Sequence, residues 1–274
     1  MNKIDTDFTG IRNSAFVTLY AHWRDSLDRR SILHDSRAGG VMEQLSFDFS
    51  QFTRIHYTRF TIAARSGLLD EWVRRFLSDN LGAVVLDVGC GLDSRVFRVD
   101  PTPGHHWYDV DFPDMITLRD RLYPKRPDHT SAGAAVTEPG WLERIPGDQP
   151  VIVVADSLFM FLPEDELRQF LRRVIDHFPR GEIVFTAYSS LVKQREAKKG
   201  LPPFFERNDI RMRWTYDGPD DIARLDDRLR LVERHSQTEL RLHRNAPLYD
   251  KLMCAFINIF PSGRYAGTVL RYRF

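Results

Sequence analysis

The chain has 274 residues, of which 42% are hydrophobic and 28% charged, and this composition excludes disordered, collagen-like and coiled-coil proteins. Its 39 Lys and Arg residues against 38 Asp and Glu residues leave a net charge of +1, so nothing in the charge favours a nucleic acid or an anionic membrane as partner. We therefore expect a globular protein that binds a small molecule.

The N-terminal part of the chain has the periodicity of helices. The pattern predicts helices over about Ala15–Leu27 and Thr58–Leu77, with an aromatic and polar stretch between them at Phe47–Tyr57. We expect an all-helical cap over residues 1–81.

From Ala83 the pattern changes to short apolar runs separated by helical segments, which is typical of βαβ units in a parallel sheet. The runs are Val84–Val88, His106–Val110, Val151–Ala155 and Glu182–Tyr188. A helix that begins near Pro163 places one apolar face toward the core, formed by Leu167, Phe170, Leu171, Val174 and Phe178.

After Ser189 the alternation stops, and the next residues are rich in charge, proline and aromatic side chains, as is typical of a lid over a binding site. The remaining pattern predicts a strand over Arg230–Glu239, a helix over Ala246–Ile257 and an antiparallel last strand over Tyr265–Phe274. We expect an α/β protein with seven strands in one mostly parallel sheet.

The most informative run is LDVGCGLDSR, from Leu86 to Arg95. A buried strand ends in this run, and Gly89 and Gly91 allow a tight turn in which the backbone approaches a nucleotide-like ligand closely. Position 94 is Ser, where a dinucleotide-binding loop would have its third glycine. The loop therefore favours a cofactor without phosphates.

The second strand ends with Asp111, twenty residues after Gly91, the separation at which an acid meets the ribose hydroxyls of an adenosine. Asp111 could also cap a helix that has Pro113 in its first turn, either in place of this role or together with it. Asp109 points to the same side of the strand, one pleat further in, and is expected to support Asp111.

Two further charged residues stand in apolar surroundings. Arg65 is centred on the apolar stripe of its helix, where a guanidinium needs either an internal ion pair or the carboxylate of an amino-acid cofactor. Asp156 follows the apolar strand Val151–Ala155 and suits a positively charged ligand group, although it could also cap a helix.

Together these segments resemble the leucine carboxyl methyltransferase family, in its bacterial branch of O-methyltransferases from polyketide pathways. The resemblance begins near Phe52 and is carried by AARSGLLDEW, LDVGCGLDSRVFR, YDVDFPDMITLRDRL, VTEPGWLERI, VVADSLFMFLPEDEL and GLPPFFERNDIRMRWTYDGPDDIARLD. It implies a class I, Rossmann-like methyltransferase fold, with S-adenosylmethionine as cofactor and S-adenosylhomocysteine as product.

The resemblance also implies roles for single residues. Arg65 would hold the methionine carboxylate, Gly89 and Gly91 would line the cofactor loop, Asp111 would take the ribose hydroxyls and Asp156 would lie near the methionine ammonium. The chain departs from the family in two places: the family usually has Glu at the position of Asp156, and an Asp-Leu pair where this chain has Ala135-Val136.

The reaction implied is methyl transfer to a small acceptor in secondary metabolism, which needs positioning and desolvation but no metal. A carboxylate acceptor would need a cationic or hydroxyl clamp, with Tyr188, Arg195, Arg211 or Arg213 as candidates, whereas a phenol would benefit from a base such as His243. The lid aromatics suggest an apolar or aromatic acceptor, or they serve as core: Phe204, Phe205, Trp214 and Tyr216.

Two other hypotheses stay open, a nicotinamide-dependent oxidoreductase and a non-catalytic protein with the methyltransferase fold.

Two cysteines, Cys90 and Cys254, are too few for a zinc cluster or a disulfide framework, and neither a signal peptide nor a membrane span is recognised, so we expect a cytoplasmic protein. We expect one domain over residues 1–274, consisting of the cap (1–81), a cofactor-binding core (82–188), a lid (189–227) and C-terminal strands (228–274).

Overall fold

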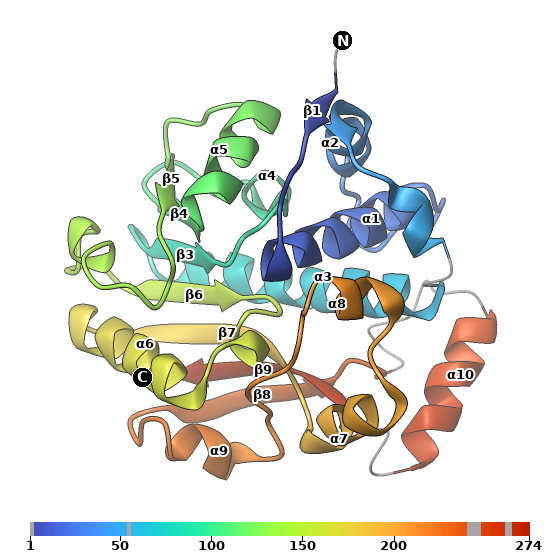
Figure 1. Cartoon of the computed structure of the whole chain (residues 1–274). Helices are drawn as coiled ribbons and strands as arrows, with labels where there is room; N and C mark the ends of the chain where they lie inside the picture. Colours follow the sequence, from blue (N-terminus) through green and yellow to red (C-terminus); the bar gives the residue numbers. More distant parts are fainter. Residues whose placement is uncertain (1–2, 54–55, 240–247, 261–264) are drawn as a thin grey trace.

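The protein is built around a seven-stranded sheet with helices on both faces (Figure 1). The computed structural model describes residues 3–53, 56–239, 248–260 and 265–274. The strands lie in the order β5-β4-β3-β6-β7-β9-β8, with bounds β3 (Val84–Val88), β4 (His106–Asp111), β5 (His129–Gly133), β6 (Val151–Ala155), β7 (Gly181–Tyr188), β8 (Arg230–Ser236) and β9 (Gly267–Arg273).

All neighbouring strands of this sheet are parallel except that β9 is antiparallel to both β7 and β8. The expected α/β fold, with seven strands and an antiparallel last strand, is therefore confirmed. The last strand is inserted between β7 and β8 and does not lie at the edge. The strand β5 was not among the apolar runs, because HTSAG, at the edge of the sheet, carries few apolar side chains.

The two faces of the sheet have separate cores because successive side chains of a strand point in opposite directions. On one face, the predicted apolar stripe of α6 (Glu164–His177) packs against Val84, Leu86 and Val88 of β3, and all five predicted stripe residues are buried. On the other face, α3 (His56–Asp79) packs Leu69 and Trp72 against Val85. The long helix α3 therefore covers the sheet directly.

The N-terminal part is helical in α1 (Ser14–Ser26), α2 (Ala38–Gln44) and the 3-10 turns η1 (Gly10–Asn13) and η2 (Phe49–Phe52). The expectation of an all-helical cap is wrong in one respect, since β1 (Ile4–Asp5) and β2 (Leu45–Ser46) form a parallel pair. Strands of two residues are too short to show any periodicity in the sequence.

The remaining helices are α4 (Arg95–Val99), α5 (Pro113–Leu122), α7 (Ser190–Lys199), α8 (Pro203–Arg207), α9 (Pro219–Ala223) and α10 (Leu248–Ile259), with the short turns η3 (Leu142–Arg144) and η4 (Phe159–Phe161). The predicted lid region thus contains α7, α8 and α9. Among the described helices, none is long and apolar enough to cross a membrane.

Candidate functional site

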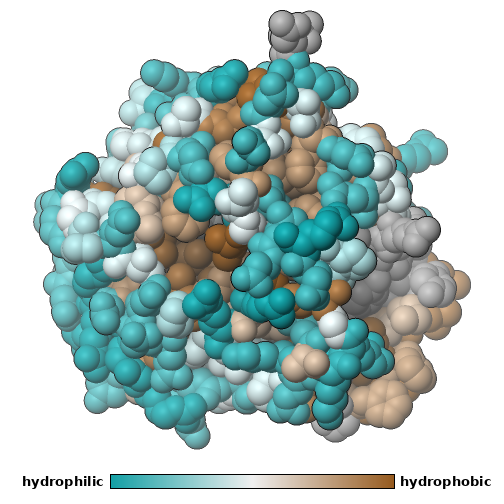
Figure 2. All heavy atoms as spheres, viewed as in Figure 1, coloured by the Kyte–Doolittle hydropathy of each residue, from teal (hydrophilic) through white to brown (hydrophobic). Residues whose placement is uncertain are grey.

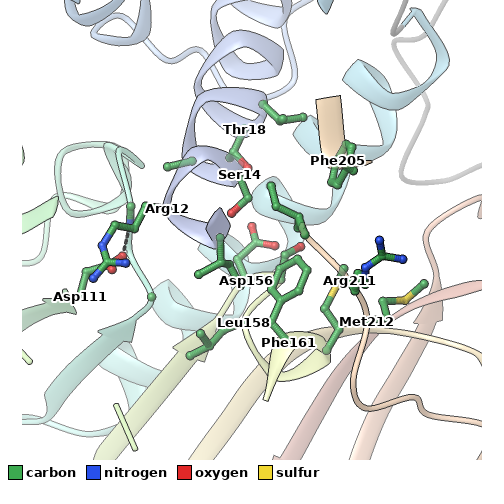
Figure 3. A pocket seen from close by; sticks show the side chains of 18 of the residues that line it. Arg12, Ser14, Thr18, Asp111, Asp156, Leu158, Phe161, Phe205, Arg211 and Met212 are labelled. Atoms are coloured by element: carbon green, nitrogen blue, oxygen red, sulfur yellow. Dashed lines mark hydrogen bonds between the residues drawn. The ribbon is translucent and has the colours of Figure 1, made fainter. Parts of the chain in front are cut away.

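A cavity of about 1320 Å³ opens at the carboxyl ends of the parallel strands. Its wall includes Asp87 of β3, Asp111 of β4, Tyr188 of β7 and Asp156, which directly follows β6. Residues of α1 and of the lid complete the wall (Figure 3), and Figure 2 shows apolar side chains exposed in a hollow near the centre of this face. This edge is where open α/β sheets bind ligands, because the loops there diverge.

The glycine loop lies against the cavity in a conformation that side chains rarely adopt. Gly89 has φ +64° and Gly91 has φ +50°. A Cβ added at Gly89 would lie 2.9 Å from Leu158 Cδ1, and one added at Gly91 would lie 3.0 Å from Ala15 Cβ. A side chain at either position would therefore strain the loop, and both glycines lie in the turn after β3 that the sequence predicts.

Asp111 closes this loop and keeps its carboxylate at the cavity wall (Figure 3). Its Oδ2 accepts a hydrogen bond of 2.8 Å from the Gly91 N–H, and its Oδ1 accepts one of 2.7 Å from the Phe112 N–H. Burial raises the pKa of Asp111, although these two backbone donors oppose the shift. The alternative helix-cap interpretation is wrong, because Phe112 is the N-cap of α5 and that helix has no side-chain cap.

Asp109 has the supporting position that was expected. It is fully buried and accepts hydrogen bonds from Arg119 Nε at 2.7 Å and Trp107 Nε1 at 2.9 Å, with His129 Nε2 at 2.7 Å from the same carboxylate. Arg119 also donates to the backbone oxygens of Gly91 and Asp93. Asp109 thus fixes the loop through Arg119.

Arg65 and Asp156, far apart in the sequence, meet at the inner end of the cavity. Arg65 Nε lies 3.0 Å from Asp156 Oδ1, and Arg65 Nη1 donates a hydrogen bond of 3.1 Å to the Tyr188 hydroxyl. Burial by itself would raise the pKa of Asp156, but the guanidiniums of Arg65 and Arg95 outweigh it and hold the pKa below its usual value. Asp156 does not cap α6, whose N-cap is Pro163.

The sequence reasoning missed a buried ionic network behind this pair. Arg95 is 0% exposed and binds Asp70, Asp87, Asp93 and Asp156, and Arg98 binds Asp70, Asp93 and Asp35. A signal was present, since two arginines three residues apart follow a strand with one aspartate, Asp87, and a loop with another, Asp93. The sequence alone could not explain these arginines, because Asp70 and Asp156, which contact Arg95, are remote in the chain.

The candidates for acceptor binding divide into three groups. Tyr188, Arg211 and Arg213 line the cavity. Arg195 is exposed and is not among the lining residues, so its predicted place in the site is wrong; it lies on the solvent side of α7. His243 lies outside the described residues.

The lid aromatics also differ from one another. Phe204 and Phe205 both line the cavity, and Phe204 also packs on Phe52 with 4.8 Å between ring centroids. Trp214 and Tyr216 belong to the core on the α6 face, so for them the core interpretation holds.

Two remaining sequence features also lie at the cavity. Ala135 and Val136, where the family has an Asp-Leu pair, both line it and bring no side-chain hydrogen-bonding group. Cys90 lines it too, and burial raises the pKa of this thiol well above its usual value, so it stays protonated. Among the described residues, no cluster of His, Cys, Asp and Glu could hold a metal ion.

The chain resembles known proteins over nearly its whole length. A profile described as leucine carboxyl methyltransferase matches residues 26–138. The chain is 34% identical to the tetracenomycin polyketide synthesis O-methyltransferase TcmP of Streptomyces glaucescens, over 97% of each chain. It is 30% identical to an S-adenosyl-L-methionine-dependent methyltransferase of Gibberella zeae, over 70% of each chain.

Solved structures of low sequence identity share the fold. A protein of the DUF574 family from Streptomyces avermitilis has a TM-score of 0.61 at 14% identity, covering 95% of this chain and 96% of that one. A Thermobifida fusca protein assigned to the methyltransferases has a TM-score of 0.59 at 17% identity, covering 97% of this chain and 96% of that one. The fold is thus that of class I methyltransferases.

Proposed function

The chain belongs to the leucine carboxyl methyltransferase family, and we propose that it methylates a carboxylate or a phenolic hydroxyl of a small aromatic acceptor. As a member of this family it is an S-adenosylmethionine-dependent O-methyltransferase. The nicotinamide-dependent alternative is thereby set aside. The observation that carries the proposal is a single cavity that joins an ionic end, suited to an amino acid, to an apolar end under the lid.

The residues of the cavity fit the cofactor. Arg65 has a buried Nε without an aligned hydrogen bond, which suits a carboxylate, and Asp156 would take the ammonium. Asp111 would hold the ribose hydroxyls, and Gly89 and Gly91 leave room for close approach of the backbone. Recognition of adenine beside Ala135 would rest on backbone groups.

The bound cofactor supplies an electrophilic methyl group on a sulfonium. The protein's own contribution is to orient the acceptor oxygen, to exclude water and to keep the acceptor anionic. Residues of α1 and of the lid cover the cavity and would exclude water (Figure 3). Methyl transfer of this kind requires no covalent intermediate with the enzyme.

The lining at the lid end supports an aromatic acceptor with polar substituents. Its apolar part includes Met160, Phe161, Phe205 and Met212, and its hydroxyl-bearing part includes Ser14, Thr18, Ser50 and Thr53. Aromatic rings pack on such apolar surfaces, and hydroxyls of the wall can bind their oxygen substituents. The Streptomyces glaucescens relative is named for polyketide synthesis, so polyketide-like aromatic acids are the first acceptors to test.

Arg213 supports the carboxylate form of the proposal. It lines the cavity and has no ion pair among the described residues, whereas Arg211 is paired with Asp209 and Glu206. An unpaired guanidinium in a binding site favours an anionic ligand.

The test measures transfer of isotopically labelled methyl to a panel of aryl and alkyl carboxylic acids and phenols. We expect labelled product with aromatic members, and mild alkaline hydrolysis then separates methyl esters, which release the label, from methyl ethers, which keep it. Arg213→Gln should raise KM for carboxylic acids alone. A protein that binds S-adenosylhomocysteine but methylates no member of the panel would contradict the proposed class of acceptor.

We further propose that residues 1–274 form one domain with the cap, core, lid and C-terminal strands given above. The proposal is supported by a shared core in which Phe16 of α1, Leu118 of α5 and Phe204 of α8 belong to one cluster. Separate domains would each bury their own core.

A further inference from the structure

Four polar side chains surround the carboxylate of Asp156, and three of them donate hydrogen bonds to it. Its Oδ1 lies 3.0 Å from Arg65 Nε and accepts a hydrogen bond of 3.3 Å from Thr186 Oγ1. Its Oδ2 accepts hydrogen bonds of 2.8 Å from Ser66 Oγ and 3.1 Å from Arg95 Nη2. A carboxylate has about four acceptor positions. The remaining position, on Oδ1, faces Arg65 Nε without an aligned hydrogen bond, so a ligand's ammonium can take it once Arg65 turns away.

The two arginines on Asp156 are held very differently. Arg95 is fully buried and also donates to Asp70 at 2.6 Å, to Asp93 at 3.0 Å and to Asp87 at 3.2 Å. Arg65 lines the cavity, and its Nε, although close to Asp156, has no aligned hydrogen bond. Its one well-formed bond is to Tyr188. Arg65 is thus the donor that can turn toward a ligand.

We propose that Arg95 is a positioning residue for the amino-acid end of the cofactor. Arg95 holds Asp156 in place and balances its negative charge while the cofactor binds. Arg65 turns from Asp156 to the cofactor's carboxylate, and the cofactor's ammonium takes the place of Arg65 beside Asp156. Without Arg95, the exchange would pass through a buried carboxylate with no cation, which is strongly unfavourable. This inference rests on the proposed function, because it assumes a cofactor with an amino-acid end.

Arg98 provides a matched control within the same network. It is almost as buried as Arg95, and it binds Asp70 at 2.8 Å and Asp93 at 2.5 Å. Its third acid is Asp35, and no contact joins it to Asp156. Removing Arg98 therefore damages the network without removing a donor from Asp156.

The experiment compares two ligands by isothermal titration calorimetry. S-adenosylhomocysteine has the amino-acid end, whereas 5′-methylthioadenosine has the same adenine, ribose and thioether but lacks it. For Arg95→Gln we expect affinity for S-adenosylhomocysteine to fall about thirtyfold, the size of effect found on truncating one partner of a buried charge pair. Affinity for 5′-methylthioadenosine should stay within about twofold.

Arg95→Lys keeps the charge but loses the forked donor geometry, so it should show a smaller loss that is again confined to S-adenosylhomocysteine. It also serves as the test if Arg95→Gln does not fold, as judged by its thermal melt. Arg98→Gln and Arg98→Lys should change the affinities for both ligands by the same factor.

Equal losses of affinity for the two ligands in the Arg95 variants would overturn the inference and make Arg95 a purely structural residue. Unchanged affinity for S-adenosylhomocysteine would overturn it as well. If the wild-type protein itself does not bind S-adenosylhomocysteine, the cofactor assignment fails, and that result is distinct from either of these.

Discussion

Arg65 is a buried residue with few hydrogen bonds to the protein, and this leaves its guanidinium able to bind a ligand. Its guanidinium is buried at 5% exposure, yet it has one aligned side-chain hydrogen bond, to Tyr188, and a close ion pair with Asp156. A guanidinium carries five N–H donors, so the hydrogen bond to Tyr188 uses only a small part of this donor capacity. A residue held only for stability would be expected to have more of its donors satisfied, as Arg95 has.

Arg65→Ala should weaken binding of S-adenosylhomocysteine by about 2 kcal/mol, because the ligand's carboxylate loses its buried counter-charge. Tyr188→Phe removes only the hydroxyl that accepts from Arg65 and should cost about 1 kcal/mol or less. Calorimetric titration of both variants measures these losses. Wild-type affinity in Arg65→Ala would show that Arg65 is structural.

The glycine loop gives a second prediction at the residue scale. Gly91→Ala places a Cβ at φ +50° and 3.0 Å from Ala15 Cβ, so the free energy of unfolding should fall by about 1–2 kcal/mol. Gly40→Ala is the control, because Gly40 lies within α2 with open space around it, and it should be stabilising by about 0.5–1 kcal/mol. Urea unfolding of the two variants measures both changes, and an unaltered midpoint for Gly91→Ala would contradict the strain argument.

At the scale of elements, the cavity is closed by segments that lie far apart in the sequence, with a separation of 195 residues between the two asparagines that join them. The turn η1 and the end of α8 meet where Asn13 Nδ2 donates a hydrogen bond of 2.5 Å to Asn208 Oδ1. Arg12, in the same turn, is paired with Asp114 of α5 and lies 4.0 Å above the Phe112 ring centroid. The N-terminal turn thus links the lid to α5, the helix that follows β4.

Asn13→Ala should loosen this link. We expect faster backbone hydrogen exchange in residues 203–210, because α8 loses its bond to η1, and a fall of about 1 kcal/mol in the free energy of unfolding. Asn80→Ala is the control, since Asn80 makes a comparable bond to the Phe76 backbone oxygen at the far end of α3. Exchange in 203–210 that is equally fast in both variants would rule out a specific role for Asn13.

At the scale of the whole molecule, buried carboxylates connect the site to stability. Burial tends to raise the pKa of Asp93 and Asp35, but other groups outweigh it. For Asp93 these are chiefly the guanidiniums of Arg98 and Arg95, and for Asp35 a hydrogen bond with His22 and the guanidinium of Arg98, so both pKa values lie well below the usual range. The pKa values of Asp109 and Asp156 are also lowered. Burial raises the pKa of Asp87 well above its usual value despite Arg95, and that of Asp111 as well.

The sign of the pH dependence follows from these shifts. The four lowered acids contribute stability above the unfolded-state pKa of about 3.9, and this stability is lost as the pH falls below it. The two raised acids act in the opposite sense, because their contribution is present below about pH 3.9 and is lost as the pH rises through their folded-state pKa values. Since the lowered acids are more numerous, the urea midpoint should fall between about pH 4 and pH 3.

Asp93→Asn should lower the midpoint at pH 7 and make its fall toward pH 3 shallower, because one of the lowered acids is gone. Asp227→Asn, at an exposed position, is the control and should follow the wild-type profile. Urea titrations at pH 7, 5, 4 and 3 measure both variants. A profile of Asp93→Asn parallel to that of the wild type would contradict the assignment.

The sequence by itself determined the features that depend on neighbours along the chain. The apolar runs of β3 and β6 and the stripe of α6 follow local periodicity, and the distance from Gly91 to Asp111 follows the length of one βα unit. Arg65 was recognised because a charge within an apolar stripe must be buried with a partner.

Only the tertiary structure decided which partners meet. Asp156 as the partner of Arg65, the network around Arg95, the exclusion of Arg195 from the cavity and the insertion of β9 between β7 and β8 all join or separate residues remote in sequence. Local patterns fix the direction in which a side chain points relative to its own element. The distance between two side chains depends on how whole elements pack, and no local pattern carries that distance.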